Sequence, residues 1–298
     1  MTADGETGRG KATFDDRYDR LDPRALFGDL AALDYEIPQH AHGVFTALLS
    51  VLRGATGEPV SVLDVCCSYG VNAALLRCDL TLGDLFRRYT DDAVLAAATS
   101  DELIAADRAF YAQHLRPDAP RVRGLDTAAN AIAYGRAVGL LDEGVVENLE
   151  THDPSEHLAR VVADVDLVTT TGGVGYVTER TFDALIGVFP AGAPPWVATF
   201  VLRMFPYDRI AAALERRGLV TEQLPGTTFR QRRFASASEQ DAAVADVRAR
   251  GLDTSGKEDD GWYHADLFLS RPVEDVSRRP LRDLLAEGSA APRGATPA

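Results

Sequence analysis

The sequence predicts an α/β fold, in which a mostly parallel sheet is covered by helices on both faces and interrupted by a helical insertion. Two observations lead to this prediction. From about residue 40 onward, helical patterns alternate with short apolar runs rich in β-branched residues, and this alternation is typical of parallel sheets. Residues 78–120 instead carry helical patterns with little strand character. Insertions of this kind usually shape a pocket or an interface.

The composition predicts a folded domain and excludes several classes of protein. Of the 298 residues, 46% are hydrophobic and 26% are charged, so the chain can bury a sizeable core, which excludes collagen, a coiled-coil rod and disorder throughout. The chain has 45 Asp and Glu residues against 31 Lys and Arg residues, a formal net charge of -14. Because such a surface repels polyanions, we expect no nucleic-acid partner.

Cysteine usage and apolar patterning indicate a cytoplasmic protein. The three cysteines are unevenly spaced and form no CxxC pair, which does not suit a disulfide framework or a zinc site. The first 20 residues lack the apolar run of a secretory signal. The longest apolar stretch, residues 186–202, is broken by prolines and falls short of the roughly 18 apolar residues of a membrane span. We therefore expect neither a membrane partner nor a bound metal.

The first predicted elements are a helix, a strand, a tight turn and a second helix. Residues 39–52 have apolar positions at helical spacing and predict a helix that enters the domain. Residues 60–65, VSVLDV, are rich in β-branched residues and predict the first strand. Small residues at 66–70 then predict a turn, and residues 71–77 continue directly as a helix.

The remaining elements follow the same alternation. The insertion contains helical patterns at 81–89 and 101–114, and a second strand at 122–126 leads into a helix at 128–138. Further strands are predicted at 145–148, 165–170, 196–202, 219–224 and 264–270. Further helices are predicted at 154–163, 179–188, 207–217 and 239–250. We expect the last strand to pair antiparallel at an edge of the sheet.

The two ends of the chain differ from the domain between them. Residues 1–20 contain acids and glycines without an apolar pattern, and they predict a flexible arm. From residue 272 to residue 298 the apolar content is low, which predicts a disordered tail. The folded α/β domain is therefore expected to span residues 21–271.

The ligand site of such a fold lies beyond the carboxyl ends of the strands, where the strand order reverses. The first strand ends in a turn whose small residues, Cys66, Ser68 and Gly70, allow a ligand to approach the backbone closely. Asp126 ends the second strand. A carboxylate at this place can accept hydrogen bonds from both hydroxyl groups of a ribose, so these residues predict a nucleotide site.

Residues 62–70, VLDVCCSYG, resemble the first motif of the class I S-adenosylmethionine-dependent methyltransferases. That motif consists of an apolar pair, an acid, an apolar residue and GxGxG. Asp64 matches the acid and Gly70 matches the last glycine, whereas Cys66 and Ser68 replace the first two glycines. The resemblance implies a Rossmann-like class I methyltransferase fold and S-adenosylmethionine as the cofactor.

The resemblance also implies roles for residues beyond the first motif. Asp126 corresponds to the ribose-binding acid, and Asn148 with Leu149 corresponds to the pair at the adenine edge. Residues 165–172 correspond to the fourth-strand motif. The cofactor-binding residues that it implies are Asp64, Cys66, Ser68, Tyr69, Gly70, Asp126, Asn148, Leu149, Thr171 and Gly172.

A dinucleotide site is the competing interpretation of the strand, turn and helix. It normally requires GxGxxG after the first strand, and no such run follows here. Asp64 and Asp126 are also 62 residues apart, whereas a dinucleotide-binding unit places its ribose acid roughly 20 residues beyond the glycine turn. The helical insertion accounts for the larger separation.

Two side chains are candidates for a direct part in catalysis. Tyr176 follows three glycines at the carboxyl end of the fourth predicted strand, where its ring can face a sulfonium and its hydroxyl can orient an acceptor. His152 follows the third strand and can act as a general base. Other aromatic residues lie near predicted strand ends and helix starts, namely Tyr69, Tyr134, Phe205 and Tyr207. As a group, they are candidates for an aromatic box around a cation.

Structural interpretations stay open for the same candidates. Asp64 can cap the turn that follows it, and Asp126 can cap the helix that begins near residue 128. Cys66 and Cys67 have no partner for nucleophilic chemistry nearby in the sequence, so packing is favoured over thiol reactivity. Tyr176 can simply belong to a flexible loop, and His152 can be an ordinary surface histidine.

Together these features predict an S-adenosylmethionine-dependent methyltransferase that acts on a small molecule by in-line displacement at the sulfonium methyl. S-adenosylhomocysteine is the expected product. One alternative is cyclisation of S-adenosylmethionine to azetidine-2-carboxylate and methylthioadenosine on the same fold, and a second alternative is a partner subunit without catalytic activity. The expected partners are a small-molecule substrate and, optionally, a second copy of the chain in a homodimer.

Overall fold

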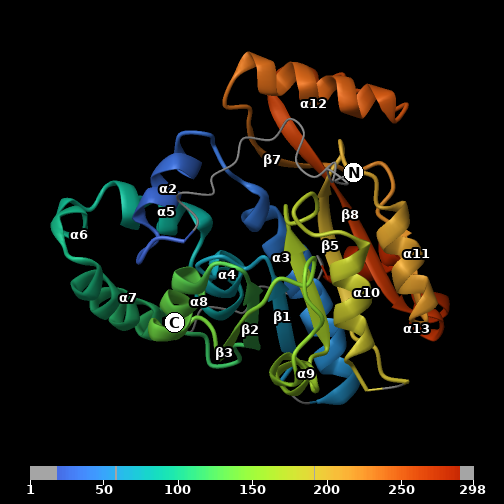
Figure 1. The fold of residues 1–298 in the computed structure, drawn as a ribbon, viewed down its shortest axis with the longest axis horizontal. Helices are drawn as coiled ribbons and strands as arrows, with labels where there is room; N and C mark the ends of the chain where they lie inside the picture. The colour runs from blue at the N-terminus through green and yellow to red at the C-terminus, as the bar shows by residue number, and fades with distance from the viewer. Residues whose placement is uncertain (1–18, 58, 191, 289–298) are drawn as a thin grey trace.

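The computed structural model describes residues 19–57, 59–190 and 192–288, and an eight-stranded sheet lies at its centre (Figure 1). The strands are β1 (Ser61–Val65), β2 (Arg121–Asp126), β3 (Glu143–Val146), β4 (Leu167–Thr171), β5 (Trp196–Leu202), β6 (Leu219–Gln223), β7 (Phe229–Arg233) and β8 (Trp262–Pro272). Their order in the sheet is β3-β2-β1-β4-β5-β8-β6, and β7 pairs with β8 beside this path.

The first five strands are parallel to one another, and they form the half of the sheet that positions the ligand site. β1 pairs with β2 on one side and with β4 on the other. β3 and β5 extend this parallel set outward, while β8 runs antiparallel to β5 and β6. The strand order therefore reverses between β1 and β4, which is where ligands bind in open α/β sheets. This arrangement is the Rossmann-like class I methyltransferase fold and confirms the predicted fold class.

Helices cover both faces of the sheet because each strand directs alternate side chains into two cores. The covering helices are α3 (Ile37–Thr56), α4 (Val71–Arg77), α8 (Ala129–Ala137), α9 (Glu156–Val162), α10 (Glu179–Gly187) and α11 (Asp208–Arg216). In β1, Val62 packs with α3, α4 and α8, whereas Leu63 packs in the core formed with α9, α10 and α11. Among the helices that the structure describes, none has the length and apolar character needed to cross a bilayer.

Three helices fill the segment for which the sequence predicts an insertion, and they lie to the left of the sheet in Figure 1. They are α5 (Leu82–Thr90), α6 (Ala93–Ala97) and α7 (Ser100–His114). Capping boxes begin two of them, formed by Thr81 with Asp84 for α5 and by Thr99 with Glu102 for α7. Each box satisfies backbone N–H groups that the first turn of a helix leaves unpaired.

A further helix, α2 (Arg24–Ala31), precedes α3 and was not predicted from the sequence. It has eight residues and no side-chain cap, so it carries few of the signals that mark a helix start. Phe27 and its apolar neighbours are buried against α5, where Phe27 stacks on Tyr89 with ring centroids 4.5 Å apart. Tertiary packing on the insertion therefore stabilises α2.

The last strand differs from the prediction. β8 was expected at an edge of the sheet, but it lies between β5 on one side and β6 and β7 on the other. This part of the prediction is wrong because β8 is 11 residues long, so its carboxyl half pairs with β6 and its amino half pairs with β7. The sequence FRQRR of β7 lacks apolar alternation and gave no strand signal.

The chain after residue 272 is also folded where the structure describes it. It forms α13 (Val273–Arg278) and α14 (Leu281–Gly288), and α14 packs against α3 with Leu281 and Leu284 buried. The predicted disorder is wrong for this part, because apolar residues at helical spacing give α14 one face for the core. Residues 289–298 of the predicted tail and residues 1–18 of the predicted arm lie outside the described residues.

Candidate active site

A cavity of about 400 Å³ lies beyond the carboxyl ends of β1, β2 and β4, where the strand order reverses. Its lining comes from α2, the turn between β1 and α4, the segment that enters α8 and the loop after β4. The volume falls within the roughly 300–1,000 Å³ that is typical of sites for small molecules. The cavity is therefore at the place where the strand pattern predicts a ligand.

The turn between β1 and α4 has three residues in the left-handed region of backbone conformation. They are Cys66 with φ 58°, Ser68 with φ 49° and Gly70 with φ 82°, the positions that match the three glycines of the first motif. Glycine adopts this conformation freely, whereas a residue with a Cβ atom is strained by roughly 1–2 kcal/mol. The turn has the backbone of a glycine motif, yet Cys66 and Ser68 line the cavity with side chains.

The carboxylate of Asp126, at the end of β2, binds this turn directly. Its Oδ2 accepts the backbone N–H of Ser68 at 2.8 Å, and its Oδ1 accepts the N–H of Ala128 at 3.0 Å. Asp126 also lines the cavity. Each carboxylate oxygen has a second lone pair, so the side chain can order the backbone and still accept hydrogen bonds from a ligand.

The hydroxyl of Ser68 is a buried polar group of the turn that lacks a partner. The residue is 8% exposed, and its Oγ has no hydrogen bond to any part of the chain that the structure describes. Leaving a buried hydroxyl unpaired costs about 1–3 kcal/mol. Because Ser68 lines the cavity, a bound ligand is the natural partner for this group.

Asp64 lies behind the turn and is held by two neighbours. The residue is 1% exposed, and its carboxylate accepts hydrogen bonds from the Thr169 hydroxyl at 2.8 Å and from Asn72 Nδ2 at 3.1 and 3.2 Å. Burial raises the pKa of Asp64 to about 7, and the nearby Asp126 carboxylate adds to this rise, while both hydrogen bonds oppose it. Asp64 does not line the cavity itself, whereas Asn72 does.

Thr171 ends β4 and Gly172 follows it, at the opposite side of the cavity from Asp126. Thr171 Oγ1 accepts a hydrogen bond from Asn72 Nδ2 at 3.1 Å. Gly172 has φ 69°, and a Cβ atom at this position would collide with the side-chain amide of Gln231. A residue with a Cβ atom would therefore be strained at this position and would have to displace the Gln231 amide.

Sequence reasoning missed several residues of the cavity. Leu26 and Leu30 of α2 line it, as does Tyr35 from the segment between α2 and α3. Burial raises the pKa of Tyr35, whose side chain has a hydrogen bond with Thr171. Asn72 had a sequence signal, since it is the one polar residue among six in VNAALL. α2 had no such signal, because its apolar residues cannot be distinguished in the sequence from ordinary core residues.

The cavity has an acidic character. Asp19 and Asp126 belong to its lining, Asp64 lies behind it, and the described lining residues include no Lys, Arg or His. Such a lining favours a cationic ligand over a phosphate. Within the described parts of the chain, no group of three or more His, Cys, Asp or Glu side chains is arranged to hold a metal.

A second, smaller cavity of about 240 Å³ adjoins the first one, and Cys66, Asp126 and Tyr176 line both. Among the predicted cofactor residues, Asn148 and Leu149 line the second cavity but not the first. The two cavities together therefore bring most of the predicted cofactor residues to one end of the sheet. Tyr176 is 42% exposed and lies at the junction.

Besides Asp64, three predicted site residues line neither cavity. Tyr69 is buried, and its hydroxyl donates to the backbone oxygen of Arg20 at 2.8 Å. Gly70 caps α4 without lining either cavity. His152 is exposed, has a hydrogen bond with Thr151 and lines only a surface depression beyond the second cavity.

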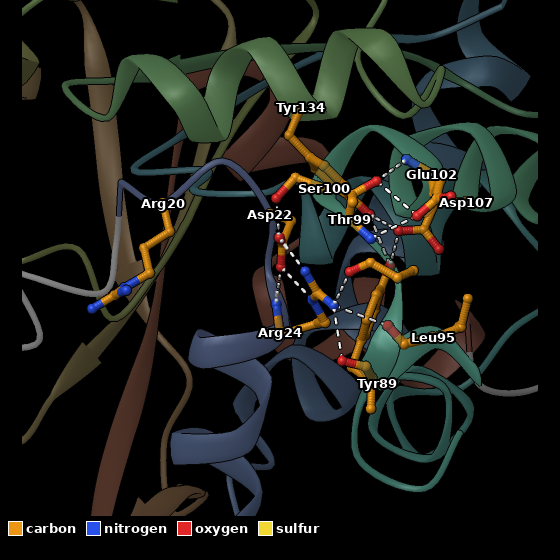
Figure 2. Close-up of polar contacts among 12 residues, drawn as sticks. Arg20, Asp22, Arg24, Tyr89, Leu95, Thr99, Ser100, Glu102, Asp107 and Tyr134 are labelled. Atoms are coloured by element: carbon orange, nitrogen blue, oxygen red, sulfur yellow. Dashed lines mark hydrogen bonds and ion pairs between the residues drawn. The ribbon is translucent and has the colours of Figure 1, made fainter. Parts of the chain in front are cut away.

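The predicted aromatic box does not form either. The hydroxyl of Tyr134 donates to the buried Asp107 at 2.7 Å, as part of a tyrosine cluster between α8 and the insertion helices α5 and α7 (Figure 2). Tyr207 stacks on Phe268 in the core. Tyr176 is the one member of the predicted aromatic set that lines the cavity among the described residues.

The N-terminal segment is fastened to the insertion beside the cavity. Figure 2 shows Arg24 between Asp22 and the insertion, where its guanidinium donates to the backbone oxygens of Leu95 at 2.9 Å and Ala98 at 2.8 Å. Ser100 donates to the same Asp22 at 2.6 Å. These contacts hold α2, with its two cavity-lining leucines, in place.

The chain matches no protein-family model and no curated protein. Among solved structures, it is similar to magnesium protoporphyrin IX methyltransferase from Synechocystis PCC 6803 with bound S-adenosylmethionine, at 11% identity over 87% of this chain and 92% of that one, with a TM-score of 0.41. It is also similar to precorrin-6y C5,15-methyltransferase from Geobacter metallireducens GS-15, at 10% identity over 72% and 80% of the two chains, with a TM-score of 0.35.

A third similar structure is a TehB-like S-adenosylmethionine-dependent methyltransferase from Corynebacterium glutamicum, at 14% identity over 75% of this chain and 85% of that one, with a TM-score of 0.35. These overall similarities are low, so the fold class rests on the strand order and direction of the chain itself. On that ground, the chain has the Rossmann-like class I methyltransferase fold.

Proposed function

We propose that the chain is an S-adenosylmethionine-dependent methyltransferase whose cofactor lies across the carboxyl ends of β3, β2, β1 and β4. The observation that carries this proposal is the turn at 66–70. Its three left-handed residues occupy the glycine positions of the first motif, and its Ser68 N–H is bound by Asp126 from the neighbouring strand. A glycine-type turn and a carboxylate thus meet in one cavity.

The residues present fit this cofactor. Asp126 offers acceptors for the ribose hydroxyls, and Asn148 with Leu149 offers an edge and an apolar surface for adenine. The unpaired Ser68 Oγ can bind a polar atom of the ligand. The acidic lining suits both the sulfonium and the ammonium of S-adenosylmethionine, which supplies an electrophilic methyl group when it is bound.

The same features disfavour a dinucleotide. Its pyrophosphate needs free backbone N–H groups at the turn before the helix, whereas the N–H of Ser68 is taken by Asp126. The cavity also has two lining aspartates and no basic side chain among its described lining residues. Both features raise the cost of binding phosphate there.

A small molecule is the proposed methyl acceptor. The cavity is of small-molecule size, and in-line displacement requires mainly that the acceptor be held close to the methyl group and aligned with it. The contribution of this chain is therefore to orient the acceptor and to exclude water, the latter through the leucines of α2 that line the cavity. Tyr176 lies at the junction of the two cavities. His152 is exposed and lines neither cavity, so this proposal does not use it as a general base.

Calorimetric titration with S-adenosylhomocysteine tests the cofactor assignment. We expect the chain to bind it, and Asp126→Ala to weaken binding at least about tenfold, because a ribose loses charge-assisted hydrogen bonds. Asp79→Ala is the control, since that aspartate is 94% exposed in its side chain. Unchanged affinity in Asp126→Ala would refute the ribose assignment.

Two other outcomes distinguish the alternatives. No binding of S-adenosylhomocysteine by the unmodified chain would refute the enzyme proposal and favour a non-catalytic partner subunit. Incubation with S-adenosylmethionine alone, followed by mass spectrometry, should give no turnover until an acceptor is added. Methylthioadenosine formed without an acceptor would instead indicate cyclisation.

A further inference from the structure

We infer, resting on the proposed function, that the side-chain oxygen of Asn72 is the acceptor for the ammonium group at the amino-acid end of S-adenosylmethionine, and that Asp64 positions it. Asn72 touches the ligand in this proposal. Asp64 acts through Asn72 and is a positioning residue.

The order of the strands places the amino-acid end of the ligand beside Asn72. Leu149 follows β3, Asp126 ends β2, the turn follows β1 and Thr171 ends β4, so these residues lie in that order across the sheet. A ligand with adenine near β3 and its ribose on Asp126 extends its remaining part over β1 toward β4. Asn72 lies there, because it donates to Thr171 from the first turn of α4.

The hydrogen bonds of Asn72 determine which of its polar atoms is left for a ligand. Its Nδ2 donates to both oxygens of Asp64, at 3.1 and 3.2 Å, and to Thr171 Oγ1 at 3.1 Å. These acceptors use both N–H groups of the amide. Asn72 is 7% exposed, lines the cavity, and its Oδ1 accepts no hydrogen bond from the described residues. The group presented to a ligand is therefore an acceptor.

Asp64 keeps the amide in this orientation. An ionised carboxylate can only accept hydrogen bonds, so a flipped Asn72 would place its oxygen against the oxygens of Asp64. Thr169 fixes the carboxylate in turn, through a hydrogen bond of 2.8 Å. These hydrogen bonds thus link Thr169 of β4 to Asp64 of β1 and Asp64 to Asn72 of α4, and they fix the position of the Asn72 side-chain oxygen.

An ammonium is the donor that fits this oxygen best. Asp64 contacts Asn72 directly, Asp126 lies within electrostatic range of Asp64, and the described lining of the cavity holds no cation. A carbonyl oxygen next to a carboxylate therefore lies in a negative field, which favours a positively charged donor over a neutral one. A ligand carboxylate would be repelled from the same point.

The test compares ligands that differ only at the amino group. Calorimetry at pH 8 measures the affinities of the unmodified chain, Asn72→Ala and Asp64→Asn for S-adenosylhomocysteine, for its analogue without the α-amino group and for methylthioadenosine. We expect the affinity of Asn72→Ala for S-adenosylhomocysteine to be roughly tenfold or more below that of the unmodified chain. Its affinity for the two ligands that lack the amino group should change by less than about twofold.

Asp64→Asn tests the positioning role. It removes the carboxylate that orients Asn72, so the preference for S-adenosylhomocysteine over its desamino analogue should fall as it does in Asn72→Ala. If Asp64 had only a structural role, Asp64→Asn would weaken the binding of both ligands equally and leave the ratio of the two affinities unchanged. Retained binding of methylthioadenosine shows that each variant is folded.

The outcomes separate this inference from the proposed function. If the unmodified chain binds neither S-adenosylhomocysteine nor methylthioadenosine, both proposals fail. If it binds them and Asn72→Ala leaves the ratio between S-adenosylhomocysteine and its desamino analogue unaltered, the cofactor assignment stands and the role of Asn72 is refuted.

Discussion

Cys66 and Ser68 show how much can change at a glycine position while the backbone stays the same. Both have positive φ angles and line the cavity, so the turn stores strain at the place where a ligand would bind. Strained residues of this kind persist where the surrounding structure holds them, and here Asp126 holds the Ser68 N–H. The sequence indicated that small residues belong in this turn, but it could not give their φ angles.

Ser68→Gly should raise the free energy of unfolding by about 1–2 kcal/mol, because it removes both the left-handed strain and a buried, unpaired hydroxyl. Urea unfolding followed by circular dichroism measures the change. Ser50→Gly is the matched control, since Ser50 is exposed within α3 and should lose about 0.5–1 kcal/mol on the same change. If both variants changed the free energy of unfolding in the same direction, the claim that Ser68 is strained would be contradicted.

Among the candidate site residues, the sequence identified those at strand ends best. Asp126, Cys66 and Ser68 follow apolar runs that are easily recognised, and all three line the cavity. His152 also follows a predicted strand, yet its segment turns outward and leaves it exposed. The direction of a loop after a strand depends on contacts made far along the chain, so strand position alone could not separate these cases.

At the scale of elements, strands built mainly of apolar or β-branched residues were predictable, and β7, with three arginines among its five residues, was not. β1 and β5 are buried along their length, and β4 is buried as far as Thr170. β7 was missed because its buried residues are Gln231 and Arg232, which are 3% and 2% exposed. Arg232 can be buried since Glu239 of α12 (Ala237–Ala249) pairs with it at 2.8 Å, and such a pairing leaves no periodic signal.

The attachment of α2 to the insertion should control ligand affinity more than global stability. Arg24→Ala removes donors to Leu95 and Ala98, so we expect α2 to detach more often and S-adenosylhomocysteine to bind roughly threefold to tenfold more weakly. Hydrogen exchange of residues 24–31 should speed up. Arg160→Ala, at an arginine with 70% side-chain exposure, should change neither quantity. Unaltered exchange in Arg24→Ala would contradict the attachment.

At the scale of the whole molecule, the fold class was predictable but the limits of the domain were not. Alternation of helices and strands predicted the parallel half of the sheet, whereas the low apolar content after residue 272 hid three leucines at helical spacing in α14. Leu284 is fully buried although it lies beyond the predicted end of the domain. The cytoplasmic location, the homodimer and the exclusion of nucleic acid remain predictions.

Leu284→Ala should lower the free energy of unfolding by about 2–4 kcal/mol, because it leaves a cavity between α14 and α3. Denaturant titration measures this loss. Leu115→Ala is the control, since that leucine is 48% exposed and should cost less than about 1 kcal/mol. Equal losses in the two variants would mean that α14 does not belong to the folded domain.

The position of β8 between β5 and β6 has a consequence for biosynthesis. β5 ends at Leu202, and the part of β8 that pairs with it ends at Ser270, so 68 residues must be translated before the β5 edge is fully covered. At about 5–20 residues per second, this takes roughly 3–14 s. All cavity-lining residues precede β5, so the nascent chain can assemble its ligand site during that interval while an open apolar strand edge still awaits its partner. Until β8 is translated, we expect that edge to be a surface of the emerging chain that pairs wrongly with other strands.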